Sequence, residues 1–229
     1  MKPYSIGIDI GTTSTKAVIF TDSGETVQEF AVAYPLLTPE PKAAEQNPDE
    51  IVQAVKVSIQ TAIQQANLKP ENIKLLSFSA AMHSLIALDE MGTPLTASIT
   101  WADQRSEAQA LRLKETNGRA IYEKTGTPIH PMAPLSKLLW LREEKPEIFH
   151  KATKFIGIKE YVFHELFGEY VVDYSIASAT GLFNIHTLDW DDEALTTAQI
   201  TKAQLPKIVP TTEIFTEMKP EIAAVLGIA

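Results

Sequence analysis

Apolar and polar residues alternate along the beginning of the chain. Residues 6–10 alternate strictly, residues 17–20 form an apolar run, and residues 26–34 follow after turn-forming residues at 22–25. Such short segments are typical of strands that turn one face toward a core. Because turn residues join the second strand to the third, the pattern predicts an antiparallel meander.

A helix start follows the proline-rich loop after the meander. Asn47 is suited to the N-cap, Pro48 to the first helical position, and Asp49 and Glu50 to the positive end of the helix dipole. Apolar residues then recur at helical spacing as far as about Asn67. The pattern predicts an amphipathic helix that covers one face of the meander.

The rest of the chain changes from strands to helices. Strands are predicted at 73–79, which reads as buried, at 85–88 and at 97–101. The predicted helices span residues 105–117, closed by Gly118, and residues 134–144, 146–150, 159–167 and 192–200. This order predicts one α/β domain over 1–229, with a sheet core at about 1–102 and a mostly helical region at about 103–229.

Composition and charge narrow the class of protein. The 229 residues are 45% apolar, and 20 Lys and Arg against 29 Asp and Glu give a formal net charge of -9. We therefore expect no nucleic-acid partner and no membrane partner. The absence of cysteine excludes disulfides and thiolate metal sites. No apolar stretch has the length of a membrane span, and no secretion signal is evident, so we expect a soluble cytoplasmic protein.

The stretch IGIDIGTTSTKAVIF carries unusual chemistry between the first two strands. Its Asp9 ends a strand, where Asp is uncommon and where unpaired burial costs on the order of several kcal/mol. Gly11 permits a tight turn that gathers backbone amides, and Thr12, Thr13 and Ser14 add hydroxyl donors. Neither common nucleotide fingerprint, the P-loop or GxGxxG, is present.

These residues predict a site for phosphate and metal. The turn from Gly11 to Ser14 favours phosphate oxygens, and Asp9 is placed to hold Mg²⁺ directly or through water, which would compensate its charge. Lys16 either supports the phosphates or pairs with a neighbouring carboxylate. The alternative is a plain hairpin in which Asp9 accepts from the turn amides.

Two motifs resemble one protein family. DIGTTSTKAVIF resembles the first phosphate-binding hairpin of the FGGY carbohydrate kinases, and MAPLSKLLWLREE resembles their signature through Pro134, Lys137, Trp140, Glu143 and Glu144. VDYSIASATGLFNIHTLDW also resembles a family segment, so the similarity covers essentially the whole chain. The resemblance implies a ribonuclease H-like fold of the actin, hexokinase and Hsp70 ATPase type, with a mixed sheet and flanking helices. It also implies ATP and Mg²⁺.

The segment SAAMHSLIALDEMGTPLTASITWADQRS resembles the part of these kinases that contacts the sugar. By this resemblance the substrate-binding residues are Met82, His83, Trp101, Asp103 and Arg105. Met82 and His83 follow a predicted strand, and the carboxyl end of a strand commonly opens onto a ligand-binding crevice. The indole of Trp101 can stack on a sugar face. By the same resemblance, the stretches AMHS and ITWADQRS imply a sugar acid, gluconate, as the substrate, with xylulose or glycerol as alternatives.

Structural roles stay open for several of these residues. His83 is equally compatible with a structural position, and Arg105 can simply bond to Asp103. Lys137 can serve a structural ion pair, and Asp173 can cap the helix that follows it. If the substrate is gluconate, Arg105, His83 or Lys137 must neutralise its carboxylate.

Phosphoryl transfer usually also needs a carboxylate that accepts the proton of the sugar hydroxyl. Asp9 is unsuited to that role if it holds the metal, and the family resemblance implies an aspartate at the opening of a second ATPase-like domain. The sequence stops at Ala229, before any such motif. We therefore expect an N-terminal half without a catalytic base, a partner in its own C-terminal domain, and little turnover alone. Whether the chain forms a homodimer stays open.

Other classes of function compete with a kinase. The same hairpin occurs in non-enzymatic ATP-binding modules of the actin or Hsp70 type, and a regulatory sugar sensor can retain the fold without catalysis. The sugar segment and MAPLSKLLWLREE favour the kinase.

Overall fold

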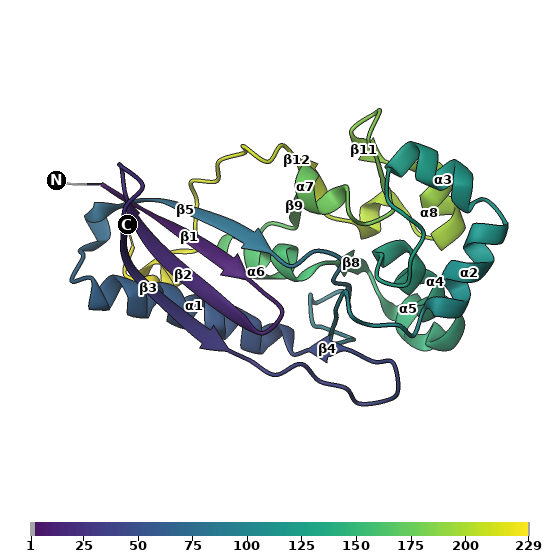
Figure 1. Cartoon of the computed structure of the whole chain (residues 1–229), viewed down its shortest axis with the longest axis horizontal. Coiled ribbons are helices and arrows are strands. Elements are labelled where there is room, and N and C mark those ends of the chain that lie inside the picture. Colours follow the sequence, from purple (N-terminus) through teal and green to yellow (C-terminus); the bar gives the residue numbers. More distant parts are fainter. Residues whose placement is uncertain (1–2, 229) are drawn as a thin grey trace.

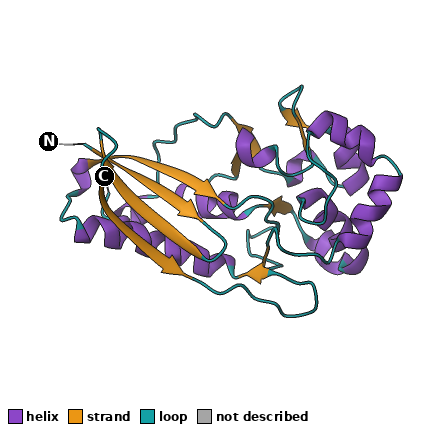
Figure 2. Ribbon diagram, viewed as in Figure 1, coloured by secondary structure: helices purple, strands orange, loops and turns teal. Residues whose placement is uncertain are grey.

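A four-stranded mixed sheet forms one end of the molecule in a computed structural model that describes residues 3–228. Helices α2 to α5 and α8 gather at the other end, whereas α1 lies along the main sheet (Figure 1, Figure 2). The turn between the first two strands points toward the middle of the molecule (Figure 1). In the described part of the chain, no helix combines the length and the hydropathy that a bilayer span requires.

The sheet confirms the predicted meander. Its strands are β1 (Tyr4–Ile10), β2 (Ser14–Thr21), β3 (Thr26–Ala33) and β5 (Ile73–Ala80), in the order β3-β2-β1-β5. The first three strands are antiparallel, and β5 runs parallel to β1. Alternate apolar side chains of β1 and β2 lie on one buried face, as period-two patterning requires.

Helix α1 (Pro48–Gln65) packs against β1, β2 and β3. The side chain of Asn47 accepts from the amides of Asp49 and Glu50, which confirms the predicted N-cap. The helix ends two residues before the expected position, and Asn67 beyond it has a left-handed φ of 52°. Its buried apolar stripe supplies much of the core beneath the sheet.

Strand β5 differs from expectation, because it is only half-buried. Leu76 and Phe78 pack against the sheet core, whereas Leu75, Ser77 and Ser79 are exposed. The prediction of a buried strand was wrong because β5 lies at the edge of the sheet, where the outer face of its alternating pattern meets solvent.

The later chain is mostly helical, as predicted. Its helices are α2 (Glu107–Glu115), α3 (Gly118–Thr125), α4 (Pro134–Glu144), α5 (Pro146–Lys151), α6 (Ile158–Phe167), α7 (Tyr174–Ala177), α8 (Asp192–Ala198) and α9 (Pro220–Leu226). Short 3-10 helices span Pro70–Asn72 and Lys202–Gln204. The bounds of α4 match the prediction, whereas α3, α7 and α9 were not expected.

Four small two-stranded sheets lie outside the main sheet. They pair β4 with β7, β6 with β8, β9 with β12 and β10 with β11. The strands are β4 (Glu45–Gln46), β6 (Ile86–Leu88), β7 (Ser98–Ile99), β8 (Lys154–Ile156), β9 (Val171–Asp173), β10 (Phe183–Asn184), β11 (Asp189–Trp190) and β12 (Lys207–Val209). The β4–β7 pair matters most for the site, because it brings the loop before α1 against the segment that follows β7.

Gly118 begins a helix instead of ending one. Helix α2 ends before Thr116, and α3 starts at Gly118. A Cβ atom on Gly118 would lie 2.6 Å from the Leu113 carbonyl oxygen, so the close approach of the two helices explains the glycine. The expected C-cap was wrong because a glycine after a helix does not distinguish a cap from a tight contact.

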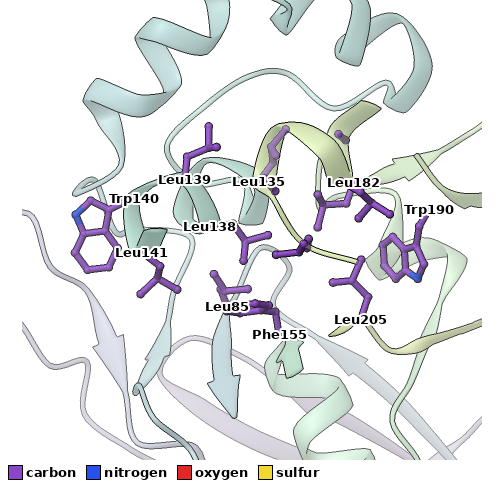
Figure 3. Packing of buried hydrophobic residues seen from close by; sticks show 14 of the residues in the cluster. Leu85, Leu135, Leu138, Leu139, Trp140, Leu141, Phe155, Leu182, Trp190 and Leu205 are labelled. Atoms are coloured by element: carbon purple, nitrogen blue, oxygen red, sulfur yellow. The ribbon is translucent and has the colours of Figure 1, made fainter. Parts of the chain in front are cut away.

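The buried apolar residues form two cores. One lies between the main sheet and α1, α6 and α9, and the other fills the helical end around Leu138, Phe155 and Trp190 (Figure 3). Each core takes residues from both sides of the division near 102. That division therefore stays a prediction, and the ends of the expected domain at 1–2 and 229 lie outside the described residues.

Candidate functional site

The turn between β1 and β2 is held through its carbonyl oxygens. The Tyr34 hydroxyl donates to the Gly11 carbonyl over 2.7 Å, and Gln46 Nε2 donates to the Thr12 carbonyl over 2.6 Å. The amide of Tyr34 donates to the Thr13 carbonyl over 3.1 Å. Because three consecutive carbonyls have protein donors, the conformation of the turn is fixed from one side.

The donors of the same turn are largely free. The Gly11 amide closes the turn on the Ser14 carbonyl over 2.9 Å, but the amides of Thr12 and Thr13 find no acceptor within residues 3–228. Nor do the hydroxyls of Thr13 and Ser14 make a hydrogen bond there. A Cβ at Gly11 would lie 3.0 Å from the Ser14 carbonyl oxygen, a tight contact that glycine avoids. Free amides and hydroxyls in one turn suit an anion such as phosphate.

Asp9 is exposed at the end of β1, beside this turn. The premise that its burial demands compensation was wrong, because the side chain lies on the open face of the sheet. Lys16 lies opposite Asp9 in the β1–β2 register, but its Nζ is 3.7 Å from Glu29 and thus pairs with that neighbouring carboxylate. Burial raises the pKa of Tyr34, and the nearby charge of Asp9 adds to the rise.

The chemistry of the turn fits a magnesium ion brought by phosphate. The Asp9 side chain makes no hydrogen bond or ion pair with the other described residues. No group of three or more His, Cys, Asp or Glu in that part of the chain is arranged to hold a metal. Mg²⁺ is commonly held by one or two carboxylates together with substrate phosphates and water, so a single free carboxylate beside a phosphate turn is sufficient.

Met82 and His83 follow β5, as the sequence predicted. Met82 is 40% exposed, and His83 has a left-handed φ of 68°. His83 Nδ1 lies 2.7 Å from the Ala179 carbonyl, which can only accept, so Nδ1 carries the hydrogen. Burial lowers the pKa of His83, which keeps the ring neutral near pH 7 and leaves Nε2 as an acceptor for a hydroxyl.

Lys137 is completely buried between the first and last parts of the sugar segment, residues 79–106. Its Nζ donates to the carbonyls of His83, Ile99 and Thr100, the last over 2.7 Å. All three of its hydrogens are thus used within the protein, and no carboxylate of residues 3–228 pairs with it. Burial lowers the pKa of Lys137 to about 7. The structure replaces the expected ion pair with a set of carbonyl contacts that tie His83 to the end of β7.

Arg105 and Asp103 form a closed ionic cluster. Arg105 Nε donates to Asp103 over 2.9 Å, and its other nitrogens donate to Glu40 and Glu45. The guanidinium also stacks on Trp140, 4.4 Å from the ring centroid. Asp103 is 1% exposed and accepts from a backbone amide as well. The alternative that Arg105 bonds to Asp103 is confirmed, and a direct role of either residue toward a substrate stays a prediction.

Trp101 connects the sugar segment with the phosphate turn. The indole Nε1 donates to the Thr12 hydroxyl oxygen over 2.9 Å, and the side chain is 47% exposed. Gln46, which holds the Thr12 carbonyl, pairs with Ser98 in the β4–β7 sheet. Neither Gln46 nor Tyr34 was predicted from the sequence. Each is a polar side chain whose partner lies in a distant segment, so no local sequence pattern marks it.

Asp173 is a helix cap. Its side chain accepts from the amides of Ser175 and Ile176 at the start of α7 and forms an ion pair with Lys159. The predicted N-cap is confirmed. A groove of about 610 Å³ runs along β5 and α6 near this pair, but none of the residues predicted to bind phosphate or sugar lines it.

Comparison with known proteins identifies the relatives of this chain. Residues 4–229 match the model of the FGGY family of carbohydrate kinases, N-terminal domain. A gluconokinase from Bacillus subtilis is 57% identical over 230 residues, which cover 100% of this chain and 44% of that protein. The chain spans about half the length of the curated relatives it matches.

Solved structures agree with this relationship. A gluconate kinase from Lactobacillus acidophilus superposes with a TM-score of 0.96 at 42% identity, covering 100% of this chain and 46% of that one. A ligand-bound xylulose kinase from the same organism superposes with a TM-score of 0.95, also at 42% identity, covering 99% of this chain and 46% of that one. The α/β fold with a mixed sheet and flanking helices predicted from the sequence is confirmed.

Proposed function

The chain belongs to the FGGY family of carbohydrate kinases, and from this premise we propose that it is the sugar- and phosphate-binding half of an ATP-dependent kinase that phosphorylates gluconate. One observation carries the proposal. The turn with free amides touches the sugar segment directly, through the 2.9 Å hydrogen bond between Trp101 and Thr12. A phosphoryl donor and a hydroxyl acceptor have to meet at such a junction.

The phosphate turn binds the triphosphate of ATP. Thr12 and Thr13 supply free amides, and the hydroxyls of Thr12, Thr13 and Ser14 add donors to phosphate oxygens. Gly11 allows the backbone to approach closely. Lys16 adds positive charge nearby once its weak surface pair with Glu29 opens.

Asp9 is the residue of this chain that would hold Mg²⁺. A magnesium ion held there would supply positive charge that offsets the charge of the phosphates. The exposed Asp9 carboxylate has no other side-chain partner in the described part of the chain, so it is available to a cation. Without a cation, the carboxylate would repel the phosphates at this short range.

The sugar contacts begin with Met82, His83 and Trp101. Neutral His83 offers Nε2 to a substrate hydroxyl, and the half-exposed indole offers a face for stacking. Asp103 and Arg105 need to release existing bonds before they contact a substrate, so we assign them to the wall of the site.

An uncharged ketose, xylulose, is the second candidate substrate. Of the three residues expected to neutralise a gluconate carboxylate, His83 is neutral near pH 7, and Arg105 and Lys137 are engaged by protein acceptors. A xylulose kinase is also among the similar structures, at the same identity as the gluconate kinase. Identity of 57% to a gluconokinase supports gluconate as the first choice.

The catalytic base and the adenosine contacts are assigned to a further domain outside this chain, by analogy with the greater length of its relatives. The chain alone should therefore produce little sugar phosphate. Closure of two domains would exclude water that otherwise hydrolyses ATP.

The test uses the polypeptide in which this chain occurs, with ATP and Mg²⁺, and measures ADP formation with gluconate, xylulose and glycerol. A kcat/KM for gluconate at least about tenfold above that for xylulose, a difference of about 1.4 kcal/mol, supports the proposal. Preference for xylulose would retire gluconate, and no ADP with any of the three would overturn kinase activity on these substrates. Robust turnover by the 229-residue chain alone would refute the assignment of the base to another domain.

A further inference from the structure

The indole of Trp101 and the hydroxyl of Thr12 join two segments that are 89 residues apart in the sequence. Thr12 lies between β1 and β2, whereas Trp101 follows β7. An indole N–H can donate but cannot accept, so the threonine oxygen is the acceptor of this 2.9 Å bond. The direction of the bond is therefore fixed by chemistry.

This direction leaves the hydrogen of the Thr12 hydroxyl available. A hydroxyl has one hydrogen and two lone pairs, and the indole occupies one lone pair. Residues 3–228 include no acceptor for the hydroxyl hydrogen. Repulsion from the indole hydrogen turns it away from Trp101. The hydroxyl thus becomes an oriented donor beside the free amides of Thr12 and Thr13.

A second contact fixes the backbone of the same residue. Gln46 is 5% exposed and donates to the Thr12 carbonyl over 2.6 Å. Gln46 belongs to β4, which pairs with β7 through the Gln46–Ser98 register, and Trp101 lies just beyond β7. One two-stranded unit therefore holds both the carbonyl and the hydroxyl of Thr12.

We propose that Trp101 is a positioning residue for the triphosphate, which it aligns through the Thr12 hydroxyl. The inference rests on the proposed function of the turn and adds a role for the indole nitrogen, separate from stacking of its ring on a sugar. When a phosphate oxygen accepts from Thr12, indole, hydroxyl and phosphate form a chain of hydrogen bonds that polarise one another. Phosphate binding at the turn therefore changes the electronic environment of the exposed Trp101 indole.

The first test is Trp101→Phe in the polypeptide in which this chain occurs, because phenylalanine keeps an aromatic face and removes the donor. We expect the KM for ATP to rise about three- to tenfold, the range of one lost hydrogen bond, while the KM for the sugar changes less than about twofold. Thr12→Val should reproduce the effect, and Thr12→Ser should retain affinity. A change confined to the sugar KM would overturn the inference.

A double-mutant cycle separates positioning from general damage. Trp101→Phe combined with Thr12→Val should be no worse than Thr12→Val alone, because both remove the same bond. Thr13→Val is the matched control, since Thr13 is also in the turn but the indole donates its hydrogen bond to Thr12 instead. The effects of Thr13→Val and Trp101→Phe on the KM for ATP should multiply in the double variant. Multiplying effects in both cycles would contradict the proposal.

A spectroscopic measurement gives a readout independent of activity. The Trp101 indole ¹H–¹⁵N resonance, assigned by its loss in Trp101→Phe, should shift when Mg²⁺ and inorganic tripolyphosphate are added without sugar. A shift of the Thr12 and Thr13 amides without one at the indole would overturn the role of Trp101 and leave the phosphate site intact. If neither the turn nor the indole responds, the proposed phosphate site fails together with this inference.

Discussion

Lys137 Nζ donates to the Thr100 carbonyl over 2.7 Å from a side chain with no exposed surface. The same ammonium also donates to the carbonyls of Ile99 and His83. The family signature MAPLSKLLWLREE therefore contributes a lysine that binds the backbone of the sugar segment at two places, His83 and Ile99–Thr100. It fixes His83 and the residue before Trp101 through their backbone carbonyls.

Replacing Lys137 by methionine should destabilise the protein by about 2–5 kcal/mol. The change leaves three carbonyl acceptors without a donor, and a buried unsatisfied group costs about 1–3 kcal/mol. Urea denaturation at pH 7 measures the free energy of unfolding. Lys145→Met is the control, because Lys145 is exposed at the end of α4 and its loss should change stability by less than about 0.5 kcal/mol. Equal effects of the two variants would show that the carbonyl contacts contribute nothing.

Lys137 should also make stability depend on pH. Its pKa falls from 10.5 to about 7 on folding, chiefly through burial, so between these values the unfolded state binds more protons. This group therefore raises the free energy of unfolding as the pH rises from about 7 toward 10.5. Comparing the pH profiles of the native protein and Lys137→Met isolates this rise. Parallel profiles would contradict it.

Glu160 should give the opposite slope at lower pH. Burial raises the pKa of Glu160 from 4.5 to about 7, and one of its carboxylate oxygens has no partner in residues 3–228. The folded state then binds more protons between these values, so stability falls as the pH rises from about 4.5 to 7, by up to about 3 kcal/mol.

Glu160→Gln should flatten that fall, because an amide does not ionise and its oxygen can still accept from Gly157. Chemical denaturation at several pH values checks this. Glu169→Gln, at an exposed position, should leave the slope unchanged. A Glu160→Gln profile as steep as that of the native protein would assign the pH dependence to other groups.

Asp9→Asn should affect magnesium dependence without affecting stability. Asp9 is exposed and has no ion pair in the described structure, so unfolding should change by less than about 0.5 kcal/mol. The loss of charge should raise the Mg²⁺ concentration for half-maximal kinase activity by about tenfold or more. Glu29→Gln is the control, because it removes a nearby carboxylate that pairs with Lys16. An unchanged Mg²⁺ titration in Asp9→Asn would rule out Asp9 as the metal ligand.

Gly118→Ala should destabilise the contact between α2 and α3 by about 1–3 kcal/mol. The added Cβ would lie 2.6 Å from the Leu113 carbonyl, which is backbone and yields little. Gly7→Ala is the matched control, because its Cβ would meet only a ring carbon of Phe20 at an ordinary 3.4 Å. Thermal unfolding compares the two, and equal midpoints would contradict the steric explanation.

Sequence alone determined the features that depend on near neighbours. The strands of the meander, the caps at Asn47 and Asp173 and the bounds of α4 each follow from residues within a few positions, because periodicity and capping are local. The Gly-Thr-Thr-Ser turn was likewise evident as a group of potential donors, although Asp9 was wrongly placed in a buried setting.

Tertiary structure alone decided which groups are free to act. Arg105 is occupied by carboxylates up to 65 residues away, Lys137 by carbonyls up to 54 residues away, and Thr12 is held by Trp101 across 89 residues. Pairing of β4 with β7 closes these long loops. No local pattern encodes that closure, because it depends on the packing of the whole chain, and it determines that the donors of the turn stay free while those of Arg105 and Lys137 do not.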